Sequence, residues 1–339
     1  MQSLLTGVER IVYIVKEENL RLWAAKYCAL GGRIIGQRAD IDTPASVTRA
    51  LRRVIIEFPE FEIELQAGVN GTQDSSLVAE VQKFGEHCLS RVMLRVEWAG
   101  EHIQKFRAMY DTLSMWEHAP ALHDKIKLVS RNPQRLWNED AQQAASLKRV
   151  DHLTFPVPVD QMDSRRAFWE ALGGEAQEVK TVGTYPADKM ILQGIFFNKG
   201  VPGKEFGIAL VAGIDGKEEL SQLTKFLRAN GPDQVQHVAY DVGDMAVFCS
   251  HFTTIGGNLL AEPIVAPDGA VQAFGWPYSG RNAAVGQYPE FLAHKIGKGV
   301  NFQQVSLDEL HAMVKNASKR KPRQLFSNCP PPSRARTQP

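Results

Sequence analysis

The sequence predicts an α+β fold in which four βαβββ modules form two open, β-barrel-like halves. An apolar strand, a helix and several further strands follow one another four times along the 339 residues. A pair of glycines ends the helix in three of these modules, as is common at helix C-termini. The third and fourth modules also open alike, each with one histidine in an apolar strand. Repeats that bury a common apolar surface determine the architecture before any chemistry is considered.

The first half follows from apolar alternation in strands and helical spacing between them. Module one is predicted to contain a strand, a helix and two strands, at residues 7–15, 18–27, 54–58 and 61–65. Gly31 and Gly32 follow its helix. Module two is predicted to contain a strand, a helix and a short strand, at residues 89–96, 101–110 and 127–129. The pattern is least regular between residues 114 and 147.

The second half shows the same order more clearly. Module three has a strand, a helix and two later strands, at residues 150–157, 163–172, 195–198 and 206–211. A helix at 218–227 leads to module four, which opens at His237. Its helix and last strands are expected at residues 243–252, 271–274 and 288–295. A helix at 307–314 closes the fold.

The two halves meet near residue 148. We therefore expect an N-terminal domain at 1–148 and a C-terminal domain at 149–316. Residues 317–339 are basic and rich in proline, which is typical of a disordered tail.

Composition restricts the range of partners. The 39 Lys and Arg residues balance 38 Asp and Glu residues, so nothing indicates nucleic acid or an anionic membrane as a partner. The four cysteines show no CxxC spacing, which favours a reducing compartment. A secretory signal and a membrane span are not evident. We expect a cytoplasmic protein that binds a small molecule, with its first half as the surface of a homodimer or higher homo-oligomer.

His152 and His237 are candidate metal ligands, because each sits near the start of a related strand. Glu290 lies in an otherwise apolar strand, where a lone charge needs a partner. Two imidazoles and one carboxylate on one face are the ligand set of non-haem Fe(II) oxygenases. Each histidine alone is more often a hydrogen-bonded core residue, and His294 shares the strand parity of Glu290 as a rival ligand. An ungapped alignment of the module openings puts arginines at the histidine positions of the first half, Arg10 and Arg91, which predicts a site in the C-terminal half only.

Four segments of the second half resemble those of the 4-hydroxyphenylpyruvate dioxygenase family, in the vicinal oxygen chelate superfamily. They lie at residues 221–239, 272–277, 290–295 and 297–302. The family's Asn-Glu-Pro turn is replaced by residues 211–213, and Ile296 stands where an aromatic residue is expected. Loss of a hydrogen-bonding group from a pocket indicates a changed substrate.

The resemblance implies the vicinal oxygen chelate fold and Fe(II) held by His152, His237 and Glu290, with no other catalytic residue. It also implies a set of substrate-binding residues: Gln222, Gln236, Gln272, Phe274 and Phe302. Without the resemblance, these glutamines would be interpreted as surface or sheet-edge residues and these phenylalanines as core residues. The implied activity is that of a non-haem Fe(II)-dependent dioxygenase. Its substrates would be dioxygen and a 2-oxo acid, 4-hydroxyphenylpyruvate-like or related, with oxidative decarboxylation coupled to hydroxylation of the same molecule.

Two other classes of function stay open. The same fold and metal suit extradiol-type ring cleavage of a catechol, or a metal-dependent lyase or isomerase reaction. A non-catalytic protein that binds a small ligand, with the two histidines packed in the core, is the other alternative.

Overall fold

The computed structural model describes most of the second half and the sheet of the first. The described residues are 5–36, 51–68, 79–81, 87–96, 122, 125–129, 145–183, 189–201, 205–216, 220–266, 269–278, 285–294, 316 and 325–326. The predicted helices at 101–110 and 307–314 lie outside these ranges, as do Phe302 and nearly all of the predicted tail. The other predicted elements can be compared with the structure.

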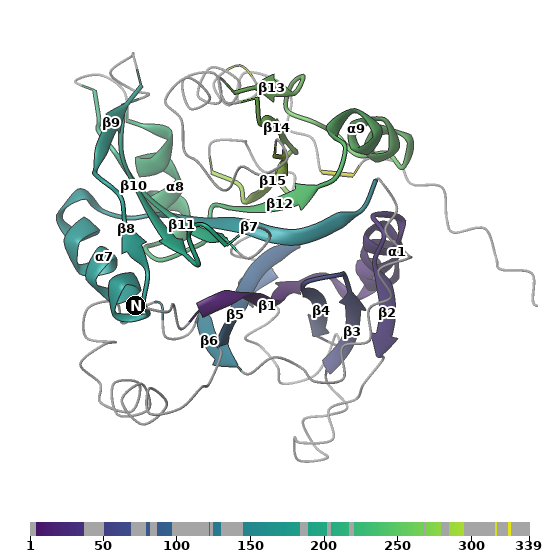
Figure 1. Ribbon diagram of the computed structural model, residues 1–339. Coiled ribbons are helices and arrows are strands. Elements are labelled where there is room, and N and C mark those ends of the chain that lie inside the picture. Colours follow the sequence, from purple (N-terminus) through teal and green to yellow (C-terminus); the bar gives the residue numbers. More distant parts are fainter. Residues whose placement is uncertain are drawn as a thin grey trace, which may run out of the picture.

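The described strands form two sheets, which lie back to back (Figure 1). The first sheet has the order β2-β3-β4-β1-β5-β6 and consists of β1 (Leu5–Ile14), β2 (Arg33–Gly36), β3 (Leu51–Glu57), β4 (Glu62–Gly68), β5 (Cys88–Val96) and β6 (Ile126–Val129). The second has the order β13-β14-β15-β12-β7-β11-β10-β8, with β9 paired to β10. Its strands are β7 (Leu147–Pro156), β8 (Glu175–Ala176), β9 (Lys180–Val182), β10 (Met190–Phe197), β11 (Phe206–Gly213), β12 (His237–Val242), β13 (Ile264–Val265), β14 (Val271–Phe274) and β15 (Tyr288–Ala293).

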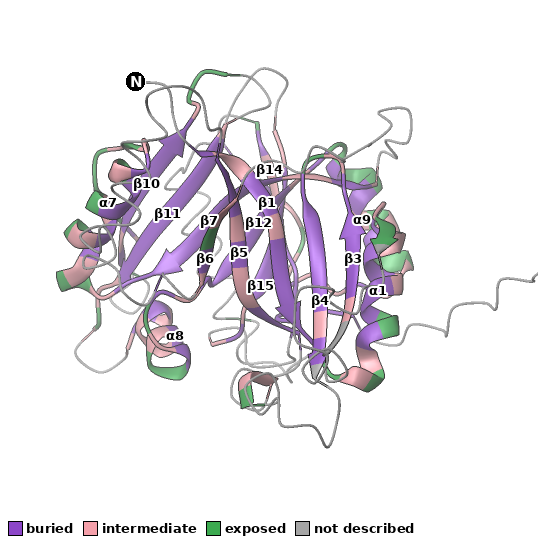
Figure 2. Cartoon of the chain, turned by 90° about the horizontal axis from the view of Figure 1, so that it is seen from below, coloured by how far each residue is buried: buried purple, intermediate pink, exposed green. Residues whose placement is uncertain are grey.

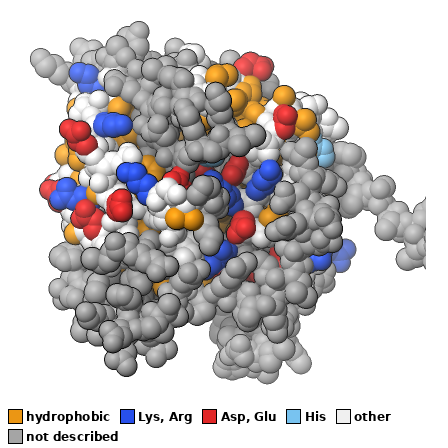
Figure 3. All heavy atoms as spheres, in the orientation of Figure 1, with side chains coloured by type: hydrophobic (Ala, Val, Ile, Leu, Met, Phe, Trp, Pro, Cys, Tyr) orange, Lys and Arg blue, Asp and Glu red, His pale blue; other side chains and the backbone are white. Residues whose placement is uncertain are grey.

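Helices flank both sheets and turn their exposed sides outward (Figure 2). They are α1 (Leu20–Ala29), α7 (Met162–Ala171), α8 (Gln222–Asn230) and α9 (Met245–Thr254), with short 3-10 helices at Glu17–Asn19 and Val159–Gln161. In the part of the chain that the structure describes, no helix is both long and apolar enough to cross a membrane. Acidic and basic side chains intermingle on the face shown in Figure 3.

Strand pairing confirms the modular α+β prediction. In modules one, three and four, the opening strand pairs in parallel with the last strand of its own module, as β1 with β4, β7 with β11 and β12 with β15. The opening strands of neighbouring modules pair antiparallel, as β1 with β5 and β7 with β12. Both sheets are open rather than closed barrels.

The glycine pairs end their helices for the same physical reason in both halves. Gly31 and Gly173 have φ of 89° and 88°, a region that L side chains rarely adopt. A Cβ on Gly32 would lie 2.5 Å from Ile56 Cγ2, and a Cβ on Gly174 would lie 2.5 Å from Ile195 Cγ2. The strand therefore packs directly against the end of the helix at both positions.

Two helices begin later than their sequence pattern indicates. The helix expected at 218–227 begins at Gln222, because Ser221 caps it by accepting a hydrogen bond from Thr224 N. The helix expected at 243–252 begins at Met245, with Asp244 accepting from Val247 N. Capping side chains fix helix starts that apolar spacing alone does not resolve. The short strands β2, β8, β9 and β13 were not predicted, since two to four residues carry too little alternation.

A cluster of buried tyrosines joins the two sheets. The Tyr13 hydroxyl on β1 lies 2.8 Å from the hydroxyl of Tyr240 on β12 and 3.2 Å from that of Tyr278. All three side chains are buried in one core that includes residues of both halves. The halves are thus connected by hydrogen bonds within an apolar layer, where an unpaired hydroxyl would be costly.

We expect Tyr13→Phe to lower the free energy of unfolding by about 1–3 kcal/mol, because it deprives two buried hydroxyls of a partner. Urea denaturation of Tyr13→Phe, Tyr240→Phe and the double variant measures this effect. The double variant should lose less than the sum of the single losses, since both changes remove the same bond. Strictly additive losses would contradict the coupling between the halves.

Alkaline pH should destabilise the protein through the same cluster. Burial raises the pKa of Tyr13, Tyr240 and Tyr278 well above the ordinary value. The folded protein therefore retains protons that the unfolded chain releases above about pH 10. Below that pH, these tyrosines should make the free energy of unfolding neither rise nor fall with pH. Above it, they should make the free energy of unfolding fall as pH rises. Denaturation of wild type and Tyr13→Phe across this range tests the point, and an equally steep fall in the variant would count against it.

Candidate metal centre

Three predicted ligands meet on one face of the second sheet. His152 lies on β7, His237 begins β12, and Glu290 lies on β15. Ala239 on β12 pairs with both His152 and Glu290, and His237 pairs with Thr154. Residues directly opposite each other, and residues two apart on one strand, share a face of the sheet. The register of these strands therefore turns all three side chains to the same side.

The ligand atoms are close enough for one metal ion. Glu290 Oε2 lies 3.3 Å from His152 Nε2 and 3.2 Å from His237 Nε2. One ligand atom from each residue fits within a span of 4.8 Å. Ligands of an octahedral ion at about 2.1 Å are about 3 Å apart, so these separations suit such an ion. The side chains are buried, with His152 4%, His237 7% and Glu290 3% exposed.

Electrostatics favour an ionised carboxylate at the centre. Burial alone would raise the pKa of Glu290, but the adjacent His152 and His237 outweigh it and hold the pKa at about 2. Burial likewise opposes charge on His152, yet Glu290 and Asp151 raise its pKa to about 9. Burial dominates at His237 and lowers its pKa. The carboxylate is thus charged at neutral pH, as a metal ligand must be.

His152 is held by a second carboxylate. Its Nδ1 lies 2.8 Å from Asp151 Oδ1, and the other carboxylate oxygen lies 2.6 Å from His294 Nε2. His294, the rival ligand of the sequence analysis, thus contacts Asp151 instead of joining the three-residue group. Asp151 was not predicted, because strict alternation would place it on the opposite face from His152.

His237 is held differently. Its ring stacks on Tyr288 with centroids 5.2 Å apart and planes at 19°. Thr154 Oγ1 lies 2.7 Å from its Nε2. Its Nδ1 is buried and has no hydrogen-bond partner among the described residues. Thr154 shares the strand parity of His152, as its alternation predicts, and so lies on the same face. Sequence reasoning missed Tyr288, although it lies in a strand already assigned to the site.

Small residues lie beside His152 on this face. Gly207 pairs with His152, and Ala209 pairs with Thr154. Two buried apolar clusters flank this area, one with Leu192, Phe196, Val211 and Leu223 and the other with Leu260, Phe274, Trp276 and Tyr288. Small side chains beside His152 and aromatic ones beside His237 and Glu290 suit a bound molecule with an apolar part.

The predicted substrate residues lie at different distances from the ligands along the sheet. Phe274 pairs directly with Glu290, and Gln272, two residues earlier on β14, pairs with Leu292 on the same face. Gln236 is buried, and its backbone donates to Thr154 O. Gln222 is the first residue of α8. Their role in binding substrate stays a prediction, and Phe302 lies outside the described residues.

In the first half, a guanidinium occupies the place corresponding to the metal ligands. Arg10 donates to Glu62 over 2.6 Å and to Glu64 over 2.7 Å. By strand register Arg10 on β1 corresponds to His152 on β7, because each follows a bulged residue and pairs with the neighbouring opening strand, Arg10 with Met93 and His152 with Ala239. Within the described ranges, His152, His237 and Glu290 form the only group of three such ligands.

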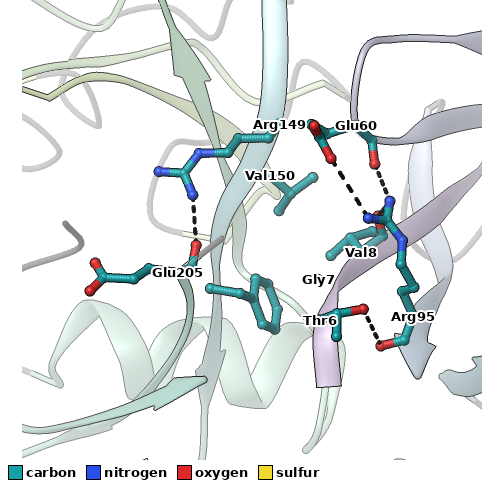
Figure 4. Close-up of a pocket in the computed structure, with 9 residues that line it drawn as sticks. Thr6, Gly7, Val8, Glu60, Arg95, Arg149, Val150 and Glu205 are labelled. Atoms are coloured by element: carbon teal, nitrogen blue, oxygen red, sulfur yellow. Dashed lines mark hydrogen bonds and ion pairs between the residues drawn. The ribbon is translucent and has the colours of Figure 1, made fainter. Parts of the chain in front are cut away.

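A cleft at the junction of the two halves has a different character (Figure 4). Arg95 and Arg149 both reach it. Arg95 pairs with Glu9 over 2.8 Å, and Arg149 pairs with Asp241 over 2.9 Å and donates to Glu205 O. Both cations are neutralised within the chain, so the charges here do not indicate an anion site.

No protein-family model and no curated protein matches the chain in sequence. Its structure is similar to a mutant of 4-hydroxymandelate synthase from Streptomyces coelicolor, with 14% identity, a TM-score of 0.64 and coverage of 93% of this chain and 99% of that one. It is also similar to a fusion of a xylose isomerase-like TIM barrel with a 4-hydroxyphenylpyruvate dioxygenase. That match has 14% identity and a TM-score of 0.57 and covers 93% of this chain and 53% of the fusion. The chain therefore has the vicinal oxygen chelate fold.

Proposed function

We propose that this chain is a non-haem Fe(II)-dependent dioxygenase that acts on a 2-oxo acid. The reaction would couple oxidative decarboxylation to hydroxylation of the same molecule. The observation that carries the proposal is the convergence of His152, His237 and Glu290 on one buried sheet face, within 4.8 Å of one another. Two imidazoles and a carboxylate are the donor set for Fe(II) that reacts with dioxygen.

The similar structures support the choice of substrate class. Their names refer to 4-hydroxymandelate synthesis and 4-hydroxyphenylpyruvate dioxygenation. The apolar clusters beside the ligands suit a 2-oxo acid with an aromatic or aliphatic side group. Val211 belongs to one of these clusters, at the place where the resembling family has a polar turn. A related 2-oxo acid without a phenol is therefore included in the proposal.

Fe(II) held by the three ligands would supply redox chemistry with dioxygen and a Lewis acid for a bound 2-oxo acid. The ionised Glu290 leaves a net positive charge on such a centre, which attracts the substrate carboxylate. Ala239 and Gly207, which pair with His152, are small and would leave room for a substrate beside it. Phe274 pairs with Glu290 and Tyr288 pairs with His237, so these aromatic side chains would help to keep water out of the site.

Metal binding should depend on all three ligands. After anaerobic reconstitution with Fe(II), we expect about one ion per chain in wild type and almost none in His152→Ala, His237→Ala or Glu290→Ala. His251→Gln is the matched control, because His251 lies on α9 and contacts Ala29 O over 2.6 Å. Full iron content in His237→Ala and Glu290→Ala would refute the site.

Oxygen consumption distinguishes the proposed reaction from its alternatives. With Fe(II) and the correct 2-oxo acid, the protein should consume dioxygen and release carbon dioxide in equal amounts, without added 2-oxoglutarate. An oxygen electrode and carbon dioxide trapping measure both, starting with 4-hydroxyphenylpyruvate and other aryl or alkyl 2-oxo acids.

Three other results would favour one of the alternative functions. A yellow product from a catechol would indicate extradiol cleavage, and conversion without oxygen would indicate a lyase or isomerase. A metal-free protein that binds such acids unchanged would be a ligand-binding protein.

A further inference from the structure

We propose that Asp151 is a positioning residue that fixes His152 as a metal ligand, and that His294 in turn holds Asp151. This inference rests on the metal site of the proposed function, but not on which reaction occurs there.

The contacts of Asp151 carry the inference. One carboxylate oxygen lies 2.8 Å from His152 Nδ1, so that nitrogen is engaged and Nε2 is the one that faces Glu290. The other oxygen lies 2.6 Å from His294 Nε2. Asp151 is fully buried. A carboxylate that accepts the free ring N–H of a ligating histidine fixes its tautomer and ring orientation.

A β-bulge brings Asp151 to this side of the sheet. Ala239 pairs with His152, and the next residue, Tyr240, pairs with Val150. Asp151 is therefore the extra residue on β7, opposite no partner of its own. Such bulges redirect a side chain that regular alternation would send to the other face. Because of the bulge, the side chains of two consecutive residues, Asp151 and His152, lie on the same side of the sheet and contact each other at the candidate metal site.

Asp151 is anchored on its far side as well. Arg149 Nη2 lies 3.7 Å from Asp151 Oδ2, and Arg149 is one of the residues lining the cleft in Figure 4. Arg149 is itself held by Asp241 at 2.9 Å. With cationic or hydrogen-bonding partners on both oxygens, the carboxylate has one preferred orientation, which is what a positioning role requires.

The first half has the same bulge with a different partner. Val8 pairs with Leu94 and Arg10 pairs with Met93, which leaves Glu9 as the extra residue on β1. Glu9 is buried too, but its carboxylate pairs with Arg95 at 2.8 Å. The bulge therefore occurs in both halves as part of the repeated module. Among the described residues, the bulged carboxylate contacts a histidine only in the second half, which contains the proposed metal ligands.

Glu9 supplies a matched control for an experiment on Asp151. Co(II) would replace iron, because it does not react with dioxygen on binding and its visible absorption reports ligand geometry. Full-length wild type, Asp151→Asn, Asp151→Ala, His294→Ala, Glu9→Gln and Glu9→Ala are compared by chelator competition and by absorption spectroscopy. The asparagine variant keeps the shape of Asp151, so the test does not depend on the alanine variant folding.

We expect Asp151→Asn to bind Co(II) about 10- to 100-fold more weakly and to change the absorption spectrum. His294→Ala should show a smaller loss in the same direction. Glu9→Gln should match wild type in both measurements, even if it unfolds more easily. A loss confined to unfolding, without a spectral change, would indicate a merely structural role.

Two results would overturn the inference. One is an affinity and spectrum of Asp151→Asn equal to those of wild type. The other is an equal loss of affinity in the Glu9 variants, which would mean that any buried bulge carboxylate has this effect. Failure of the proposed metal site is a separate result, since wild type would then bind no Co(II), or His237→Ala would bind it as tightly as wild type.

Discussion

Strand β12 pairs antiparallel with β7 and parallel with β15, and the candidate site depends on these two registers. They place Ala239 directly between His152 and Glu290 and bring His237 beside Thr154. A slip of one residue would turn a whole strand's side chains to the other face of the sheet. The apolar core behind β12, which includes Tyr240, holds the register because a slipped strand would bury its polar face instead. The stability of the sheet and the geometry of the candidate site therefore depend on the same pairing.

The two halves use one scaffold for different electrostatic purposes. In the first, Arg10 pairs with buried Glu62 and Glu64, and Arg53 adds a second positive charge beside Glu64. In the second, His152 and His237 face a single buried Glu290. A guanidinium is permanently charged and completes its own ion pairs, whereas an imidazole can release a proton and then offer a ring lone pair to an exchangeable cation. The change from arginine to histidine at the module openings thus separates a structural ion pair from a candidate metal centre.

Sequence reasoning succeeded where periodicity or repetition carries the signal. It predicted the α+β modules and the helix ends at Gly31 and Gly173. It identified the three residues that the structure brings together, although their role as ligands stays a proposal. It placed two helix starts too early, because the caps Ser221 and Asp244 outweigh apolar spacing. It missed Asp151, because alternation does not reveal a bulge, and Tyr288, because a buried aromatic residue reads as core.

The sequence by itself determined the modules, the half that contains both His152 and His237, and the types of metal-ligand atom available. These follow from local periodicity and from the chemistry of single side chains. Only the tertiary structure decided that His294 contacts Asp151, that His237 stacks on Tyr288, and that the ligand atoms lie within one ion's reach. These facts depend on strand register, on one bulged residue and on contacts between segments distant in sequence, which alternation and composition do not encode.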